Sequence, residues 1–246
     1  MNIFKVFVRK SCWTINKVFP LPTSLFRFIL SFVNDKDLYV LKKSENVFSN
    51  IYEYNFWQSS ESRSGGGSTM EATVAIRKKL PLIFDEYSIN SILDVPCGDY
   101  NWMKTIDKSN LTYIGGDIVS DIVIKNNELF QTDRISFRTI DITKDSLPKV
   151  DLIFCRDCLQ HLSEEKVIKA LNNFKRSGAR YLLTTSYPKT WRNYDVLDGD
   201  YRAINLLIAP FCLPSPILSI KETINIGNEK DKVLLLFKIE DISIIK

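Results

Sequence analysis

From residue 88 onward, short apolar runs alternate with polar, helix-capable or turn-like segments. This rhythm is typical of strand–helix–strand units, in which a parallel sheet carries helices on both faces. No internal repeat interrupts it. The runs that we expect to be strands cover residues 91–95, 112–116, 135–140, 150–155 and 180–185.

The last two apolar runs predict an antiparallel end of the sheet. Residues 217–226 and 232–239 are both apolar, and the turn-like residues between them begin with Gly227 and Asn228. A glycine–asparagine turn between two such runs is typical of a β-hairpin. The pattern therefore predicts an α/β fold with a doubly wound, mostly parallel seven-stranded sheet that finishes in an antiparallel C-terminal hairpin.

The chain before residue 88 follows a different pattern. Residues 59–69 (SSESRSGGGST) are of low complexity and indicate a flexible loop or a mere linker. Apolar positions near helical spacing over 70–87 predict a helix interrupted near Pro81. We therefore expect an N-terminal helical or amphipathic extension over 1–58, a glycine-rich loop and cap helix over 59–87, and the main domain over 88–246.

Residues 1–33 carry basic residues and no acidic one, and they are rich in Phe, Ile, Leu and Val. Their longest uncharged apolar run, 28–33, is far shorter than the ~20 residues of a membrane-spanning helix, and no small-residue cleavage site follows it. Two interpretations stay open. The segment either lies on the inner face of a membrane as an amphipathic helix, or packs on the domain or on the second subunit of a homodimer.

Composition narrows the classes of function. The 246 residues are 45% hydrophobic and 25% charged, which is typical of one globular α/β domain with a short extension. A net charge of +4 is too small to indicate a nucleic-acid partner, but it is compatible with an acidic small substrate. The five irregularly spaced cysteines favour a reducing, cytoplasmic compartment. Cys155 and Cys158 lack the second ligand pair that zinc requires, so we predict no metal.

Acidic residues follow the predicted strands at one edge of the sheet. Asp94 ends the first strand before a turn that contains Gly98, and Asp117 and Asp141 end the second and third strands. Ligands of open α/β sheets bind beyond the carboxyl ends of the strands, and an acid about 20 residues after the first turn grips ribose hydroxyls. Asp117 has that spacing, and Asp141 can accept a hydrogen bond from an exocyclic amino group such as that of adenine.

Four segments over roughly residues 88–240 resemble the nucleotide-binding motifs of class I S-adenosylmethionine-dependent methyltransferases: ILDVPCGDY, YIGGDI, RTIDIT and DLIFCRDCLQHLS. SGGGST, DVPCGDYNWM and CRDCLQHLS further resemble a bacterial subgroup that is often linked with surface-glycan modification. Pro96 and Tyr100 stand where the common first motif has glycines. Fewer glycines leave a phosphate less backbone to lie on, which disfavours a nicotinamide oxidoreductase.

The resemblance implies a Rossmann-like methyltransferase fold with S-adenosyl-L-methionine as the cofactor. The residues after the first strand are expected beside the methionine part of the donor, those after the second at the ribose and those after the third at the adenine. The implied cofactor-binding residues are Asp94, Pro96, Cys97, Gly98, Asp117, Ile118, Asp141, Ile142 and Arg156, with Trp57, Ser64, Gly65 and Thr69 closing over the donor from upstream.

Methyl transfer to a hydroxyl requires a positioned acceptor and a general base. His161 is the only histidine, lies past the end of the fourth strand, and titrates in the right range. Asp157 is the second candidate base, and Arg156 can orient an anionic acceptor. The alternatives are a packed or capping role for His161 and a salt bridge for Arg156.

The segment after the fifth strand is dense in aromatic, amide and charged side chains, which suit the faces and hydroxyl edges of a sugar ring, and loops there usually shape the acceptor pocket. Trp191 and Tyr194 can stack on such a ring. The residues that we predict to bind substrate are Tyr100, Trp102, Tyr187, Arg192, Asn193, Asp195, Tyr201, Arg202 and Asn205.

Together with these side chains, the resemblance implies an enzyme that O-methylates a sugar, sugar phosphate or nucleotide sugar in the biosynthesis of a bacterial surface polysaccharide such as capsule or O-antigen. Two alternatives stay open. One is methylation of a phosphate or phosphoramidate-type group on such a precursor, and the other is a non-catalytic protein that retains the donor-binding fold.

Overall fold

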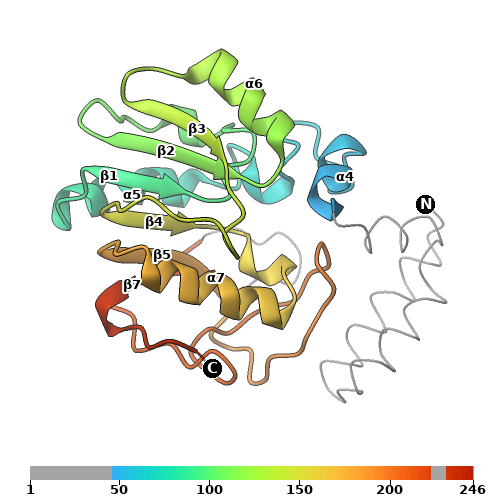
Figure 1. Cartoon of the computed structure of the whole chain (residues 1–246), viewed down its shortest axis with the longest axis vertical. Coiled ribbons are helices and arrows are strands. Elements are labelled where there is room, and N and C mark those ends of the chain that lie inside the picture. The colour runs from blue at the N-terminus through green and yellow to red at the C-terminus, as the bar shows by residue number, and fades with distance from the viewer. Residues whose placement is uncertain (1–45, 223–230, 246) are drawn as a thin grey trace.

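The computed structural model describes residues 46–222 and 231–245, which form a twisted sheet with helices on both sides (Figure 1). The strand order is β3-β2-β1-β4-β5-β7-β6. The first five strands are parallel, β7 is antiparallel to β5, and β6 is antiparallel to β7. The strands are β1 (Ser91–Asp94), β2 (Thr112–Asp117), β3 (Ile135–Thr139), β4 (Leu152–Cys155), β5 (Tyr181–Ser186), β6 (Leu218–Lys221) and β7 (Val233–Lys238).

This arrangement confirms the predicted doubly wound sheet and its antiparallel C-terminal strands. The strand bounds mostly agree with the apolar runs to within one or two residues, whereas β6 is shorter than expected and ends at Lys221. The predicted turn at Gly227 and Asn228 and the two interpretations of residues 1–33 lie outside the described residues.

Four α-helices lie in the described part of the chain: α4 (Val47–Glu53), α5 (Val74–Glu86), α6 (Ser120–Phe130) and α7 (Glu164–Arg176). None of the described helices is long and apolar enough to span a membrane. The interruption expected near Pro81 was wrong, because α5 continues through it. A proline removes one backbone hydrogen bond, and the burial of Ile76, Leu80 and Ile83 against the sheet keeps the helix in place.

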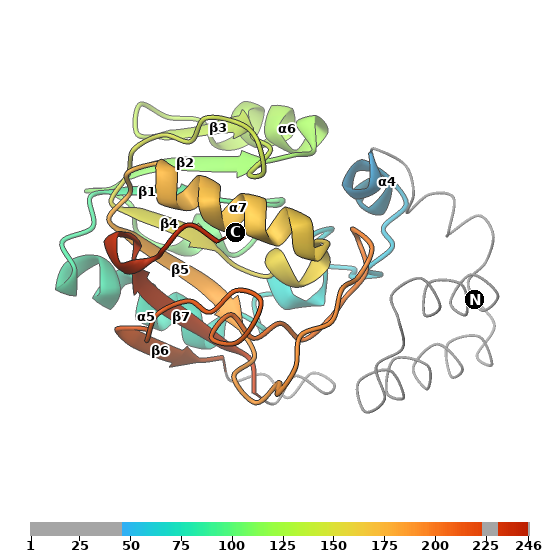
Figure 2. The same ribbon diagram turned by 60° about the horizontal axis from the view of Figure 1, so that its bottom comes forward.

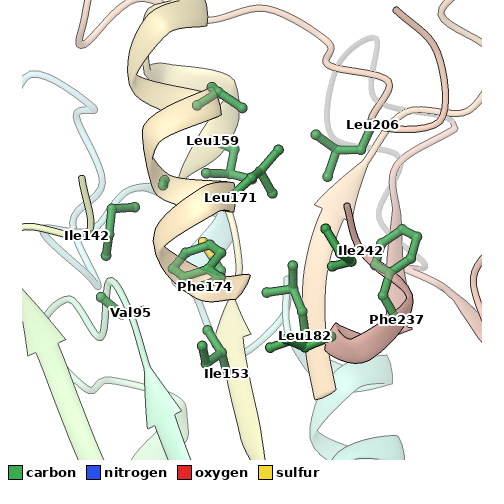
Figure 3. Packing of buried hydrophobic residues seen from close by; sticks show 14 of the residues in the cluster. Val95, Ile142, Ile153, Leu159, Leu171, Phe174, Leu182, Leu206, Phe237 and Ile242 are labelled. Atoms are coloured by element: carbon green, nitrogen blue, oxygen red, sulfur yellow. The ribbon is translucent and has the colours of Figure 1, made fainter. Parts of the chain in front are cut away.

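Successive residues of the central strands face opposite sides of the sheet, and each side is covered. In β4, Ile153 lies in the cluster that includes Phe174 of α7 (Figure 3). Its neighbours Leu152 and Phe154 lie in the other cluster, with Leu80 of α5. Figure 2 shows α7 in front of the sheet and α5 beyond it. Because both faces are buried, the strands need nearly continuous apolar runs, which is the pattern seen in the sequence.

Candidate functional site

A pocket lies at the carboxyl edge of β1, β2 and β4. The chain passes from β1 to β2 and β3 on one side, then crosses back to β4 on the other side of β1, so the strand order reverses at this edge. Ligands of open α/β sheets bind at such a reversal. The predicted cofactor residues that line the pocket are Trp57, Ser64, Asp94, Pro96, Cys97, Gly98, Asp117, Ile118, Asp141, Ile142 and Arg156.

Asp94 is buried at the end of β1, with its side chain 3% exposed. The hydroxyl of Tyr113 donates a hydrogen bond of 2.6 Å to Asp94 Oδ2. Burial raises the pKa of Asp94 to about 7, although this hydrogen bond and the charge of Lys108 oppose the rise. A ligand that brings positive charge to this carboxyl would stabilise its ionised form.

Asp117 ends the neighbouring strand and is similarly buried. Its carboxylate accepts hydrogen bonds from the N–H groups of Gly98, at 3.1 Å, and Val119, at 3.0 Å. Burial raises the pKa of Asp117 to about 6 against the effect of these hydrogen bonds. The pocket wall therefore holds two acids whose pKa values lie near neutrality, an arrangement that often marks a functional site.

The turn after β1 brings backbone close to this acid pair. Gly98 has φ +53°, and a Cβ at this position would overlap Ser64 Oγ. Asn126 of α6 donates from Nδ2 to the carbonyl oxygen of Gly98 at 2.8 Å. Glycine is needed at position 98 because both the left-handed backbone and the contact with Ser64 exclude a side chain.

The end of β3 supplies an apolar section of the pocket. Ile140 and Ile142 line it on either side of Asp141. Asp141 accepts hydrogen bonds from Thr143 N at 2.9 Å and Thr143 Oγ1 at 2.6 Å. Although burial acts to raise the pKa of Asp141, Thr143 and the nearby Lys144 lower it below its ordinary value. The Asp141 carboxylate is therefore ionised at neutral pH, and Thr143 and Lys144 already use part of its capacity to accept hydrogen bonds.

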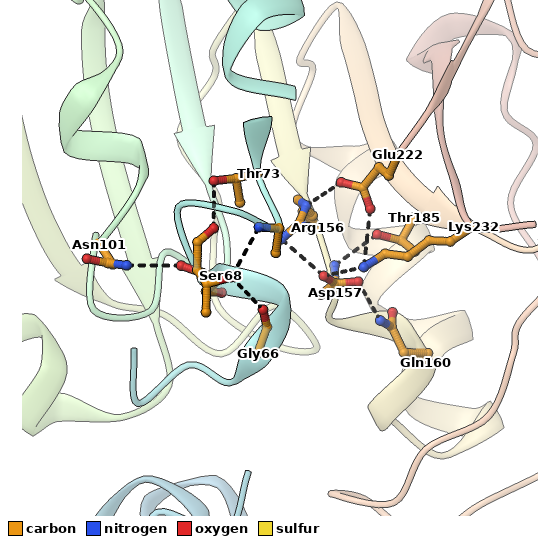
Figure 4. Close-up of polar contacts among 12 residues, drawn as sticks. Gly66, Ser68, Thr73, Asn101, Arg156, Asp157, Gln160, Thr185, Glu222 and Lys232 are labelled. Atoms are coloured by element: carbon orange, nitrogen blue, oxygen red, sulfur yellow. Dashed lines mark hydrogen bonds and ion pairs between the residues drawn. The ribbon is translucent and has the colours of Figure 1, made fainter. Parts of the chain in front are cut away.

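A cluster of four charged side chains, three of them buried and Asp157 half-buried, lies at the end of β4 (Figure 4). Arg156 Nε donates to Glu222 Oε1 at 2.6 Å, and Arg156 Nη1 lies 3.0 Å from Asp157 Oδ2. Lys232 Nζ lies 2.6 Å from Asp157 Oδ2 and 3.2 Å from Glu222 Oε2. The salt bridge that was the alternative role of Arg156 is therefore present, and Arg156 also lines the pocket.

The carboxylate of Asp157 is surrounded by hydrogen-bond donors, which makes it poorly suited to take up a proton. Gln160 Nε2 donates to its Oδ1 at 2.8 Å, in addition to the two cations on Oδ2. Burial acts to raise the pKa of Asp157, but the charges of Arg156 and Lys232 outweigh it and hold the pKa well below its ordinary value. A carboxylate with so low a pKa is a weak general base.

His161 lies at the end of the short helix η3 (Leu159–His161), against the pocket wall rather than in its lining. Its Nδ1 is 2.8 Å from the carbonyl oxygen of Asp200. A carbonyl oxygen only accepts hydrogen bonds, so Nδ1 carries the proton and Nε2 is the atom that can take up another. The ring packs between Trp57 and Tyr201, at centroid distances of 5.5 and 5.8 Å.

The segment upstream of α5 covers one side of the pocket, which it lines through Ser64, among others. Gly65, with φ +96°, lies against Trp57, because a Cβ there would be 3.3 Å from Trp57 Cβ. Thr69 does not line the pocket, and its Oγ1 donates to the carbonyl of Gly66 at 3.0 Å. Of the four predicted upstream residues, Trp57 and Ser64 therefore line the pocket, whereas Gly65 and Thr69 shape the segment itself.

Four of the predicted substrate residues bond to backbone, either of the loop after β5 or near the start of α7. Asn193 Nδ2 donates to the carbonyl of Asn205, and Asn205 Nδ2 donates to that of Thr190. Asp195 accepts from the N–H of Glu164 at the start of α7. Arg202 is buried and donates to the carbonyl of Leu162, and burial lowers its pKa to about 10. Asp195 and Arg202 hold the loop after β5 against the start of α7, whereas Asn193 and Asn205 bond within the loop itself. None of the four lines the pocket.

The other predicted substrate residues are scattered. Trp102 lines the pocket beneath Arg156, whose guanidinium carbon is 5.7 Å from the Trp102 ring centroid. Tyr100 is buried against Tyr113 and Phe137, and Tyr187 is buried beside Tyr201. Arg192, Trp191 and Tyr201 are exposed, and Tyr194 is half-buried.

The pocket also contains residues that the sequence did not single out. Phe48 and Tyr52 line it from α4, where their spacing of four residues puts both on one helix face. Arg63 and Lys166 add two cationic side chains to the lining. The spacing of Phe48 and Tyr52 is the one sequence feature that could have pointed to α4 as part of the pocket. No sequence feature marks Lys166, because only the tertiary fold brings it to the pocket.

Within residues 46–222 and 231–245, no group of three or more His, Cys, Asp or Glu side chains could hold a metal ion. Cys155 and Cys158 are free thiols there.

Comparison with solved structures identifies the fold. The N-methyltransferase NodS from Bradyrhizobium japonicum WM9 in complex with S-adenosyl-L-homocysteine aligns with 77% of this chain and 98% of its own, at 13% identity and a TM-score of 0.57. Human N-acetylserotonin methyltransferase in complex with S-adenosylmethionine aligns with 92% of this chain and 66% of its own, at 12% identity and a TM-score of 0.57.

A third methyltransferase, the Burkholderia thailandensis 1,6-didemethyltoxoflavin-N1-methyltransferase, aligns with 79% of this chain and 90% of its own, at 11% identity and a TM-score of 0.55. No protein-family model matches the sequence, and no curated protein matches it. At sequence identities of 11–13%, the similarity to these proteins shows a shared fold and nothing more specific. The chain has the Rossmann-like fold of solved S-adenosylmethionine-dependent methyltransferases.

Proposed function

We propose that this protein is an S-adenosylmethionine-dependent methyltransferase. The observation that carries the proposal is the pair of buried carboxyls, Asp94 and Asp117, at the carboxyl ends of neighbouring strands in the pocket. The donor offers complementary groups, because it combines an ammonium and a sulfonium with a ribose diol and an adenine ring. The likeness in fold to methyltransferases solved with this donor or its product supports the same ligand here.

The described residues fit this donor. Asp94 suits the methionine ammonium and Asp117 suits the ribose hydroxyls, while Ile140 and Ile142 offer an apolar surface to adenine. A dinucleotide suits the turn less well, because a single glycine beside an acid gives a pyrophosphate few bare N–H groups. The donor supplies an activated methyl group, so the protein mainly positions the acceptor and takes up its proton.

We propose His161 as the general base in preference to Asp157. The two cations and Gln160 around Asp157 keep its carboxylate ionised and weakly basic. The contact of His161 Nδ1 with the Asp200 carbonyl places the ring proton on Nδ1, so Nε2 is the nitrogen that would take up the proton of the acceptor. An acceptor held beside Trp57 would lie near this ring.

We propose that the acceptor is a hydroxyl of a sugar, sugar phosphate or nucleotide sugar of a bacterial surface polysaccharide. The resemblance of the sequence motifs to the glycan-linked subgroup supports this choice. So do the partly exposed rings of Trp57 and Tyr201, which offer aromatic faces near the pocket. Arg63 and Lys166 in the lining favour a second candidate, methylation of a phosphate or phosphoramidate-type group on such a precursor.

Calorimetric titration with S-adenosylhomocysteine tests the donor. Wild type should bind with micromolar affinity, Asp117→Ala should bind at least about tenfold more weakly because a charged hydrogen bond is lost, and the exposed control Asp133→Ala should bind like wild type. Screening of phosphorylated and nucleotide sugars with labelled S-adenosylmethionine then tests the acceptor. A folded wild type that binds no donor contradicts the proposal, and binding without transfer to any acceptor favours the non-catalytic alternative.

A further inference from the structure

Residues 61–70, the strap, are tied to the turn after β1 by a carboxylate outside the pocket lining. Asp99 accepts hydrogen bonds from Ser62 Oγ at 2.9 Å, Arg63 N at 2.9 Å and Ser64 Oγ at 3.3 Å. The N–H of Asp99 donates back to Ser64 Oγ at 3.0 Å. One carboxylate therefore holds three successive residues of the strap.

A second tie, through Asn101, joins the same turn to both ends of the strap. Asn101 Nδ2 donates to the carbonyl of Ser68 at 3.1 Å (Figure 4). It also donates to Glu61 Oε1 at 2.7 Å. Glu61 Oε1 also accepts from the N–H of Met70 at 2.7 Å. These bonds close the strap into a compact loop that is anchored along its length.

The anchored strap forms a wall of the pocket. Arg63, Ser64 and Ser68 line it. Gly67 lies against the end of β4, since a Cβ there would be 2.9 Å from Asp157 Oδ2. The strap therefore reaches from the turn after β1 to the end of β4, which are the two sides of the strand-order reversal.

We propose that Asp99 is a positioning residue for the donor, which holds the strap closed over the pocket and so sets how fast the donor and its product leave. This inference rests on the proposed donor. Asp99 does not line the pocket, so it reaches the ligand only through the strap. Loss of a wall of the pocket raises the dissociation rate more than it changes the association rate.

The test compares the binding kinetics of S-adenosylhomocysteine for wild type, Asp99→Ala, Asp99→Asn and the control Asp133→Ala. We expect dissociation from Asp99→Ala to be at least about tenfold faster, because charge-assisted hydrogen bonds are lost, with association changed by less than about threefold. Asp99→Asn should be intermediate because its remaining carbonyl oxygen still accepts. The control should match wild type.

Trypsin cleavage after Arg63, followed by mass spectrometry without ligand, reports on the strap itself. Cleavage should be at least about tenfold faster in Asp99→Ala than in wild type, since proteolysis follows local opening. Faster cleavage with unchanged dissociation of S-adenosylhomocysteine would overturn the proposed role in donor residence. Equal rates of cleavage in Asp99→Ala and wild type would show that the hydrogen bonds of Asp99 do not hold the strap in place. If wild type binds no S-adenosylhomocysteine, the donor proposal fails, whatever the cleavage result.

Discussion

Asp94→Asn should stabilise the free protein while it weakens donor binding. Burial raises the pKa of Asp94 from 3.8 to about 7. A carboxyl whose folded pKa is raised contributes stability that is complete below its unfolded pKa and is lost as pH rises through the folded pKa. At about 1.4 kcal/mol per pH unit, ionised Asp94 therefore costs the folded state at most about 4 kcal/mol above pH 7. Asparagine removes that cost and still accepts the hydrogen bond of Tyr113 through its carbonyl oxygen.

Thermal unfolding at pH 5 and pH 8 measures this effect. Because relaxation of the folded state reduces the upper limit, we expect a gain of about 1–3 kcal/mol at pH 8, and about 2–4 °C in Tm per kcal/mol for a chain of this size. The gain should be smaller at pH 5, and S-adenosylhomocysteine should bind the variant at least about tenfold more weakly. A variant that is less stable than wild type at pH 8, or a gain that does not grow with pH, would mean that ionised Asp94 does not destabilise the folded state.

Three further results should follow. Binding of S-adenosylhomocysteine should tighten from pH 5 to pH 8, because Asp94 and Asp117, with pKa values raised to about 7 and about 6, must ionise to bind it; calorimetry that gives equal affinities would contradict this. Gly98→Ala should lower the free energy of unfolding by about 1–3 kcal/mol in urea titrations, because its Cβ would overlap Ser64 Oγ; wild-type stability would mean that the strap moves aside freely. His161→Ala should lower methyl transfer at least about 100-fold with donor affinity unchanged, and undiminished turnover would exclude His161 as the base.

The fold and the location of the pocket could be predicted because both depend on local periodicity. Buried central strands require continuous apolar runs, and each of the first four runs ends in, or is soon followed by, a polar residue. Asp94 and Asp117 end two neighbouring parallel strands and Asp141 follows the third, and parallel strands bring their carboxyl ends to one edge. The residues of this edge that the sequence singled out do line the pocket.

The loop after β5 could not be interpreted from its composition. Asn193 and Asn205 have the polarity of a sugar site, yet in the structure their amides bond to loop carbonyls. The pairing of Arg156 with Glu222 joins residues that are far apart in the chain, and only the tertiary fold brings them together. Polarity alone does not distinguish a side chain that satisfies backbone groups from one that binds a ligand.

A crystal structure of the protein with S-adenosylhomocysteine would show whether the donor site is the pocket at the carboxyl edge of the sheet. We expect the ligand to lie across the ends of β1, β2 and β3, with the ribose hydroxyls on the Asp117 carboxylate, the adenine beside Ile142, and the strap closed over it. A ligand bound elsewhere on the molecule, or one in this pocket with its ribose away from Asp117, would contradict it.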